Sequence, residues 1–129
     1  MTYLLDAHTL LWFVAGDATL PLSVRNLIED RKTRRFVSIA TLWEIAIKVN
    51  LGKLTMAVGF KELAPHYLLE NDMSILPISV PHLQRFVQLP YHHRDPFDRL
   101  LIAQSIVEDM PILSRDGVFD AYDSERIWG

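Results

Sequence analysis

The sequence predicts an α/β fold, a three-layer α/β/α sandwich with a central parallel sheet. Two observations predict it. Short apolar runs alternate with amphipathic segments along the whole chain, and strands separated by helices pair in parallel, with helices on both faces of the sheet. The chain has 129 residues, half of them hydrophobic, without repeats, low-complexity segments or linkers, so residues 1–129 are expected to form one domain.

The amino-terminal part of the chain predicts one strand and two helices. The apolar run "TYLL" at 2–5 indicates a strand, and "AHTLLWFVA" at 7–15 indicates a helix that Gly16 ends. A second helix is expected at 21–32, because its apolar residues recur at helical spacing and Pro21 suits a helix start.

The middle of the chain predicts a second strand and two further helices. "RFVSI" at 35–39 indicates the strand, and the helix at 40–52 ends at Gly52. One face of that helix is apolar and comprises Leu42, Ile45, Ala46 and Val49. The helix expected at 58–71 is weak in its middle, because Pro65 interrupts it.

The carboxyl-terminal part predicts strands at 74–79 and 111–114, helices at 80–89 and 95–109, and an edge strand at 125–128. In open parallel sheets ligands bind in the crevice beyond the carboxyl ends of the strands. The chemistry of this protein is therefore expected at that edge.

Composition excludes several classes of site. The net charge of −3 gives no overall attraction to nucleic acid, and the basic run at 31–35 is interpreted as solvated surface. There is no cysteine, so disulfides and thiolate metal sites are excluded. Asp6 interrupts the first apolar run, no basic region precedes it, and no stretch is long enough to span a bilayer. We therefore expect a cytoplasmic protein that does not enter a membrane.

Two aspartates follow predicted strands. Asp6 comes directly after the strand at 2–5, and Asp116 comes just after the strand at 111–114, so both are expected at the ligand-binding edge. Each also has a structural interpretation. Asp6 suits the N-cap of the next helix, and Asp116 precedes a glycine, a common turn pair.

Glu44 lies in the helix at 40–52 and has two interpretations. With Thr41 it has the spacing of a capping box, which requires the helix to begin at Thr41. If Ser38 is the cap instead, Glu44 lies in the second turn and projects toward the sheet edge.

The segment "HHRDPFDRLLIAQ" places two more acids at a helix start. Asp95 suits the N-cap and Pro96 the first helical position, which leaves Asp98 in the first turn. The positive end of the helix dipole favours ionised carboxylates there, as a metal ligand requires.

The conjunction of these acids predicts a metal site. Two like charges about 4 Å apart cost on the order of 4 kcal/mol at an effective dielectric constant of 20, so a cluster of carboxylates requires a cation or a protonated member. Oxygen ligands without cysteine suit Mg²⁺ or Mn²⁺. Such a site is typical of enzymes in which a metal-activated water attacks a phosphodiester in line.

Four segments carry a resemblance to a known family: "LLDAHTLLW", "SIATLWEIAIKVNLGKL", "HRDPFDRLLIAQ" and "ILSRDGVFDAY". Their order and approximate spacing resemble PIN-domain proteins, most closely the bacterial VapC-type toxins of type II toxin–antitoxin modules. The resemblance covers essentially the whole chain. It implies a PIN-like nuclease domain and a metal-dependent endoribonuclease that hydrolyses RNA to a 5′-phosphate and a 3′-hydroxyl. It also implies a cognate antitoxin and a homodimer.

The resemblance also implies roles for individual residues. The catalytic, metal-binding acids are Asp6, Glu44, Asp98 and Asp116. Asp95 supports Asp98 or only caps its helix, and Ser114 positions water or phosphate. Because they flank these acids in the sequence, the candidates for contact with RNA phosphates are Arg94, Arg99, Arg115 and Lys48.

Three alternatives are weighed against this hypothesis. His92 and His93 could give mixed histidine–carboxylate ligation, although adjacent histidines point to different sides. A receiver-like signalling domain also has an acidic Mg²⁺ pocket, but "SILPIS" ends without the required aspartate and "ERIWG" supplies no lysine. A catalytically inactive module that only binds RNA or an antitoxin is a third alternative, because geometry decides activity.

Overall fold

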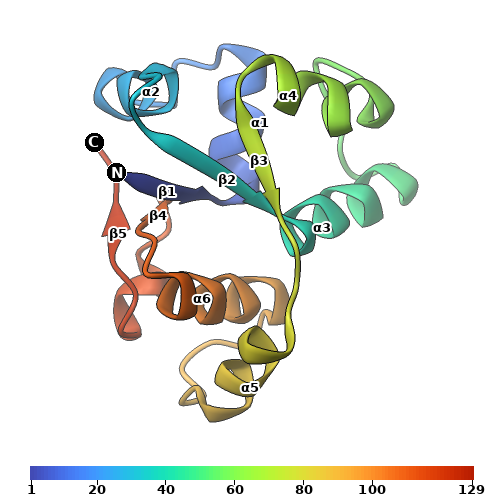
Figure 1. Ribbon diagram of the computed structural model, residues 1–129. Helices are drawn as coiled ribbons and strands as arrows, with labels where there is room; N and C mark the ends of the chain where they lie inside the picture. The colour runs from blue at the N-terminus through green and yellow to red at the C-terminus, as the bar shows by residue number, and fades with distance from the viewer.

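The computed structural model of the protein describes all residues 1–129. Its strands form one five-stranded parallel sheet with the order β3-β2-β1-β4-β5. The strands are β1 (Thr2–Leu5), β2 (Arg34–Ser38), β3 (Met73–Leu76), β4 (Ile112–Leu113) and β5 (Arg126–Ile127). The predicted α/β fold with a central parallel sheet is confirmed (Figure 1).

Six α-helices and two helical segments of other types connect these strands. The α-helices are α1 (Ala7–Ala15), α2 (Leu22–Glu29), α3 (Ile39–Asn50), α4 (Leu68–Glu70), α5 (Val80–Gln88) and α6 (Pro96–Glu108). The other two segments are the π-helical η1 (Glu62–Tyr67) and the 3-10 helix η2 (Gly117–Ala121). None of these helices combines the length and the apolar character needed to cross a membrane.

The helix predicted at 58–71 is interrupted in its middle, as the sequence indicates. The structure has η1 followed by α4, and Ala64 inside η1 has an extended backbone with φ −127° and ψ 116°. The cause is Pro65, because a proline disfavours the helical conformation in the residue before it. The segment η2 between β4 and β5 was predicted only as a turn.

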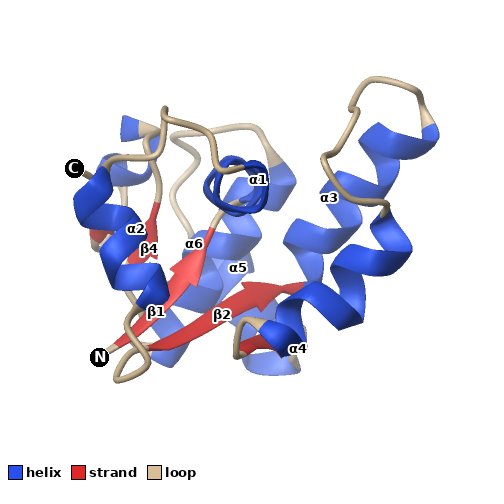
Figure 2. Cartoon of the chain, turned by 90° about the horizontal axis from the view of Figure 1, so that it is seen from above, coloured by secondary structure: helices blue, strands red, loops and turns tan.

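Two hydrophobic cores cover the two faces of the sheet. Along β1, Leu5 packs into the larger core with residues of α1, α2, α3 and α4, whereas Leu4 packs into the other core with residues of α6. In β4, Leu113 and Ile112 divide in the same way. Figure 2, viewed from above, shows α1, α2 and α4 on the near side of the sheet and α5 and α6 behind it. This is the predicted three-layer arrangement.

The strand order reverses between β1 and β4. From β1 the chain builds the sheet outward through β2 to β3, and it then returns to place β4 on the other side of β1. Ligands of open α/β sheets bind at such a reversal, beyond the carboxyl ends of the strands. Asp6 follows β1 and Ser114 follows β4, so both lie at this position.

Candidate functional site

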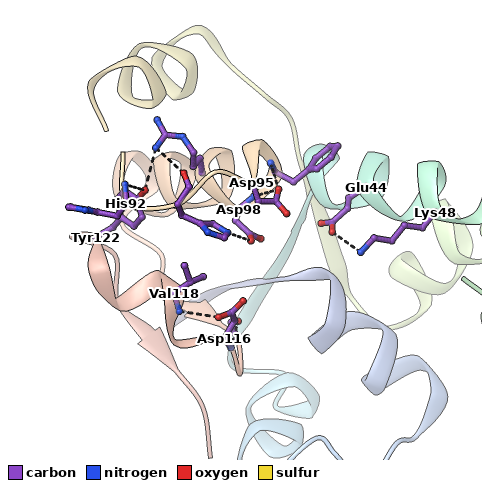
Figure 3. Close-up of polar contacts among 12 residues, drawn as sticks. Glu44, Lys48, His92, Asp95, Asp98, Asp116, Val118 and Tyr122 are labelled. Carbon is purple, nitrogen blue, oxygen red and sulfur yellow. Dashed lines mark hydrogen bonds and ion pairs between the residues drawn. The ribbon is translucent and has the colours of Figure 1, made fainter. Parts of the chain in front are cut away.

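A pocket of about 270 Å³ lies beyond the carboxyl ends of the strands. It is lined mainly by ionisable side chains: Asp6, His8, Glu44, Lys48, His93, Asp95, Asp98 and Asp116, together with Ala7. The four acids predicted as metal ligands thus line one cavity. Figure 3 shows three of them arriving from different elements: Asp98 from the start of α6, Glu44 from α3 and Asp116 from the segment after β4.

Asp6 is the N-cap of α1 and also lines the pocket. Its Oδ1 atom accepts a hydrogen bond from the amide of Thr9 at 2.9 Å, and the Thr9 hydroxyl donates to the carbonyl of Leu113 at 2.8 Å. The side chain of Asp6 is therefore tied to the ends of both β1 and β4, and only 8% of the residue is exposed. The capping and pocket interpretations of Asp6 are compatible, because only one oxygen makes the cap.

Glu44 lies in the second turn of α3, because Ser38 is the N-cap of that helix. The Ser38 hydroxyl accepts a hydrogen bond from the amide of Ala40 at 3.0 Å, and Thr41 is buried inside the helix. The capping-box interpretation of Thr41 and Glu44 is therefore wrong. The carboxylate of Glu44 faces the pocket and forms an ion pair with Lys48 at 3.1 Å.

The start of α6 brings a histidine and two aspartates together. Oδ1 of Asp95 accepts hydrogen bonds from the amides of Phe97 at 2.8 Å and Asp98 at 3.3 Å, which makes Asp95 the N-cap. Nε2 of His93 lies 2.8 Å from Oδ2 of Asp98. One ligand atom from each of His93, Asp95 and Asp98 lies within 4.8 Å of the others. Asp6, Glu44 and Asp116 line the same pocket but are not part of this closest group.

Burial raises the pKa of Asp98 to about 6. The hydrogen bond from His93 opposes this shift, and the charges of Asp95 and Glu44 reinforce it. The negative charges of Asp95 and Glu44 thus disfavour the ionised form of Asp98. A bound cation would offset this effect.

Ser114 supports Asp116 and does not line the pocket. Its buried hydroxyl oxygen accepts a hydrogen bond from the Asp116 amide at 3.0 Å, and Oδ1 of Asp116 accepts from the amide of Val118 at 3.0 Å. Arg126 of β5 donates to the carbonyl of Ser114 at 3.2 Å while it forms a two-bond pair with Asp120. In this structure the Ser114 hydroxyl thus contacts the backbone that carries Asp116, and its predicted role in positioning water or phosphate stays a prediction.

Sequence comparison identifies the family. The PIN domain family matches residues 3–125 of the chain. The chain belongs to the PIN-domain family. No curated protein matches the sequence significantly.

Several solved structures are similar to this PIN domain, and one of them is a toxin–antitoxin complex. A chain of VapBC2 from Rickettsia felis, bound to a DNA fragment from their promoter, aligns over 100% of both chains with a TM-score of 0.75 and 13% identity. A toxin–antitoxin complex from Klebsiella pneumoniae covers 97% of this chain and 95% of the other, with a TM-score of 0.66 and 16% identity. FitAcB from Neisseria gonorrhoeae covers 98% and 96%, with a TM-score of 0.58 and 20% identity. At identities this low, these similarities show only that the folds are alike. The receiver-like alternative is excluded, because the chain belongs to the PIN-domain family.

The donor set of the pocket fits the divalent metals that PIN domains bind through acidic residues. The donors are carboxylate oxygens together with the imidazoles of His8 and His93, and hard divalent cations prefer carboxylate oxygens. His93 reaches the pocket, whereas His92 packs its ring against Tyr122 at 5.2 Å. The two adjacent histidines therefore point to different sides, as predicted, and of the two only His93 is placed to contact a metal.

The structure places the predicted phosphate contacts in three environments. The predicted phosphate contact of Arg99 is corrected by the structure. Its guanidinium is buried and donates to the carbonyls of Pro90 and His93, so it is not available to a phosphate. Arg94 and Arg115 are exposed and line cavities that adjoin the acidic pocket. Lys48 lies in the pocket itself, paired with Glu44.

The basic run at 31–35 is only partly the solvated surface that the sequence predicts. Arg31, Lys32 and Arg34 are exposed, but Arg35 is buried. Its guanidinium donates to backbone carbonyls around the start of β2, those of Ile28, Asp30 and Asp72. Neither this burial nor the contacts of Arg99 have a signal in the local sequence, because both depend on segments that meet only in the fold.

Proposed function

We propose that the chain is a metal-dependent endoribonuclease that acts in the cytoplasm as the toxin of a type II toxin–antitoxin module. The observation that carries this proposal is the convergence of Asp6, Glu44, Asp98 and Asp116 in one pocket at the strand-order reversal. Family membership supports it, as does the structural similarity to VapBC2 and to a chain of a toxin–antitoxin complex. The proposal treats residues 1–129 as one nuclease domain.

In this proposal the four acids hold one or two Mg²⁺ or Mn²⁺ ions. When bound, the metal would supply an activated water and would stabilise the charge that develops on the phosphate. The chain's own contribution is to fix the carboxylates beforehand. Caps hold Asp6 and Asp116, the Asp95 cap sets the start of α6, and His93 holds one oxygen of Asp98.

The substrate in this proposal is RNA, which must bring a phosphate to an acidic pocket. The local charge balance supports this, because Arg94, Arg115 and Lys48 lie around the acids and can attract neighbouring phosphates. Transfer RNA, ribosomal RNA and messenger RNA are all candidate substrates.

The proposed partners are a cognate antitoxin and a second copy of the chain. Exposed apolar side chains support the homodimer. On α3 and its C-cap they are Ile39, Trp43 and Leu51, and on α5 they are Val80, Leu83 and Val87. Both α3 and α5 pack against α6, so the two sets of exposed apolar side chains lie on either side of α6. Light scattering after gel filtration tests the dimer, and a monomeric protein at micromolar concentration would contradict it.

The test of the enzyme proposal is cleavage of purified transfer RNA, ribosomal RNA and messenger RNA transcripts. We expect cleavage with Mg²⁺ or Mn²⁺ that EDTA stops and Asp6→Asn abolishes. Asp30→Asn is the matched control, because Asp30 also bonds a backbone amide, that of Lys32 at 2.9 Å, but lies outside the pocket. A folded wild-type protein that binds the metal and leaves all three RNA classes intact would favour the inactive binding module instead.

A further inference from the structure

Arg99 is a buried cation next to the acidic pocket. It follows Asp98 directly in α6, and consecutive helical residues point about 100° apart, so its side chain leaves the helix away from Asp98. Only 6% of Arg99 is exposed, yet no carboxylate lies within ion-pair distance of it. A buried charge without an anionic partner is costly unless other contacts compensate.

Two aromatic rings and three oxygens provide this compensation. The guanidinium carbon lies 5.0 Å from the ring centre of Phe86 and 4.8 Å from that of Tyr91. The Nη1 atom donates to the carbonyl of Pro90 at 3.1 Å, to the hydroxyl of Tyr122 at 3.3 Å and to the carbonyl of His93 at 3.5 Å. Arg99 therefore connects the end of α5, the loop before α6 and the segment after β4.

The loop at residues 90–93 is held by these contacts. The Tyr122 hydroxyl accepts a hydrogen bond from the amide of His92 at 3.0 Å, so Arg99 and Tyr122 bind the backbone on consecutive residues of the loop. The side chain of His93, at the end of this loop, contacts Asp98 at 2.8 Å. A continuous set of contacts thus runs from Arg99 through the loop to the carboxylate of Asp98.

We propose that Arg99 is a positioning residue of the metal pocket, which with Tyr122 fixes the 90–93 loop so that His93 orients the carboxylate of Asp98. This inference rests on the proposed function, because it concerns the binding of the divalent cation. Arg99 acts through the loop and does not itself contact metal or RNA.

The experiment measures Mn²⁺ binding without RNA, by titration calorimetry and by the electron paramagnetic resonance of free Mn²⁺. Loss of a group that orients a metal ligand typically weakens binding about 10- to 100-fold. We expect Arg99→Met and His93→Ala each to weaken Mn²⁺ binding by about that factor. Because both changes break the same set of contacts, the double variant should bind Mn²⁺ no more weakly than the weaker of the two single variants.

Arg35→Met is the matched control. Arg35 is similarly buried and, like Arg99, donates three hydrogen bonds to oxygens, all of them backbone carbonyls, but it lies near the amino-terminal end of β2, away from the pocket. We expect it to destabilise the fold as Arg99→Met does while the affinity for Mn²⁺ stays unchanged. If Arg99→Met does not fold, Tyr122→Phe removes only the hydroxyl that the amide of His92 and Arg99 share. We expect it to weaken Mn²⁺ binding and Tyr67→Phe, on the far side of the sheet, to leave it unchanged.

Wild-type affinity in Arg99→Met, or in Tyr122→Phe where that variant replaces it, would overturn this inference and leave the proposed function standing. Additive effects of Arg99→Met and His93→Ala would also overturn it, since Arg99 would then act independently of His93. A wild-type protein that binds no Mn²⁺ in the pocket would overturn the proposed function and this inference together.

Discussion

Nε2 of His93 lies 2.8 Å from Oδ2 of Asp98, in a pocket that also contains the carboxylates of Asp95 and Glu44. This contact only partly offsets the burial of Asp98, whose pKa is raised to about 6. The first-turn acid of α6 is thus less stable as an anion than the same residue in an unfolded chain. Burial of the ionised Asp98 carboxylate destabilises the protein without metal. A bound cation would stabilise the same carboxylate.

Asp98→Asn is expected to stabilise the metal-free protein at pH 8. The pKa of Asp98 is higher in the folded state than its ordinary value of 3.8, so the folded state binds the proton more tightly. The contribution of Asp98 to stability is therefore most favourable below pH 4 and falls as the pH rises from about 4 to 6, by at most about 3 kcal/mol. The neutral side-chain amide of Asn at position 98 removes the cost of burying a charge, and its oxygen can still accept a hydrogen bond from His93.

Urea unfolding in EDTA at pH 5 and pH 8 measures the effect. The gain of Asp98→Asn over wild type should be larger at pH 8, and Asp30→Asn is the control. A loss of stability at pH 8 would mean that the contact with His93 outweighs the burial of the charge.

Mn²⁺ is expected to stabilise the wild-type protein more at pH 7.5 than at pH 5.5. Below pH 6 a proton competes with the metal for Asp98, and affinity falls by up to about tenfold for each pH unit. The midpoint of thermal unfolding, measured with Mn²⁺ and with EDTA at each pH, reports the difference. Equal metal-dependent shifts at both pH values, or an undiminished shift in Asp98→Asn, would argue against Asp98 as a ligand.

The sequence predicts the acids at strand ends and helix starts well, because their positions follow from local rules. Asp6 follows an apolar strand, and Asp95 and Pro96 mark the start of α6, the helix that leads the chain back to β4. The alternation of parallel strands and helices therefore brings both acids to the edge where the strands end. Glu44 is harder, since its direction depends on whether Ser38 or Thr41 begins α3. The local pattern allows both caps, and the end of β2 at Ser38 decides between them.

The supporting contacts of the site are not predictable from local patterns. Arg99 looks like a surface cation beside two acids, but the loop before α6 and Tyr122, 23 residues later, bury it. The contact of Ser114 with the Asp116 amide is equally hard to predict, because it depends on the turn that follows β4. Neither the partner nor the burial of such residues has a periodic signal, so the position of Arg99 beside Asp98 in the sequence led to a predicted phosphate contact that its burial does not support.

Lys48→Met is expected to strengthen Mn²⁺ binding up to about fivefold. Lys48 forms an ion pair with Glu44 at 3.1 Å and is partly exposed, and pairs of this kind contribute about 0.2–1 kcal/mol. Without the lysine, Glu44 is free for the metal and the pocket is more negative. Calorimetric titration with Mn²⁺ measures the change, with Lys53→Met, outside the pocket, as the control. Weaker Mn²⁺ binding would show that Lys48 supports the site in its metal-bound state.

Ser114→Ala is expected to destabilise the protein by about 1–2 kcal/mol and to weaken Mn²⁺ binding. The change leaves the Asp116 amide without the acceptor that it has in a buried hydroxyl. Ser124→Ala is the control, because it also removes one hydroxyl bond, to the carbonyl of Phe119, on the chain between η2 and β5. If Ser114→Ala lowers stability but leaves Mn²⁺ affinity unchanged, the position of Asp116 does not depend on Ser114.

Arg94→Ala and Arg115→Ala are expected to weaken RNA binding without changing metal affinity. Both side chains are exposed in cavities beside the acidic pocket, where a phosphate backbone passing over the metal would lie. Each lost phosphate contact on single-stranded RNA lowers the slope of log affinity against log salt by about 0.7. Fluorescence anisotropy of labelled polyuridine, with Mg²⁺ and the Asp6→Asn variant as the cleavage-deficient background, gives this slope across a range of KCl concentrations. Arg31→Ala, exposed at the other edge of the sheet, should leave the slope unchanged. An equal loss in all three variants would indicate a diffuse attraction to basic side chains, and RNA would then have no defined path across the pocket.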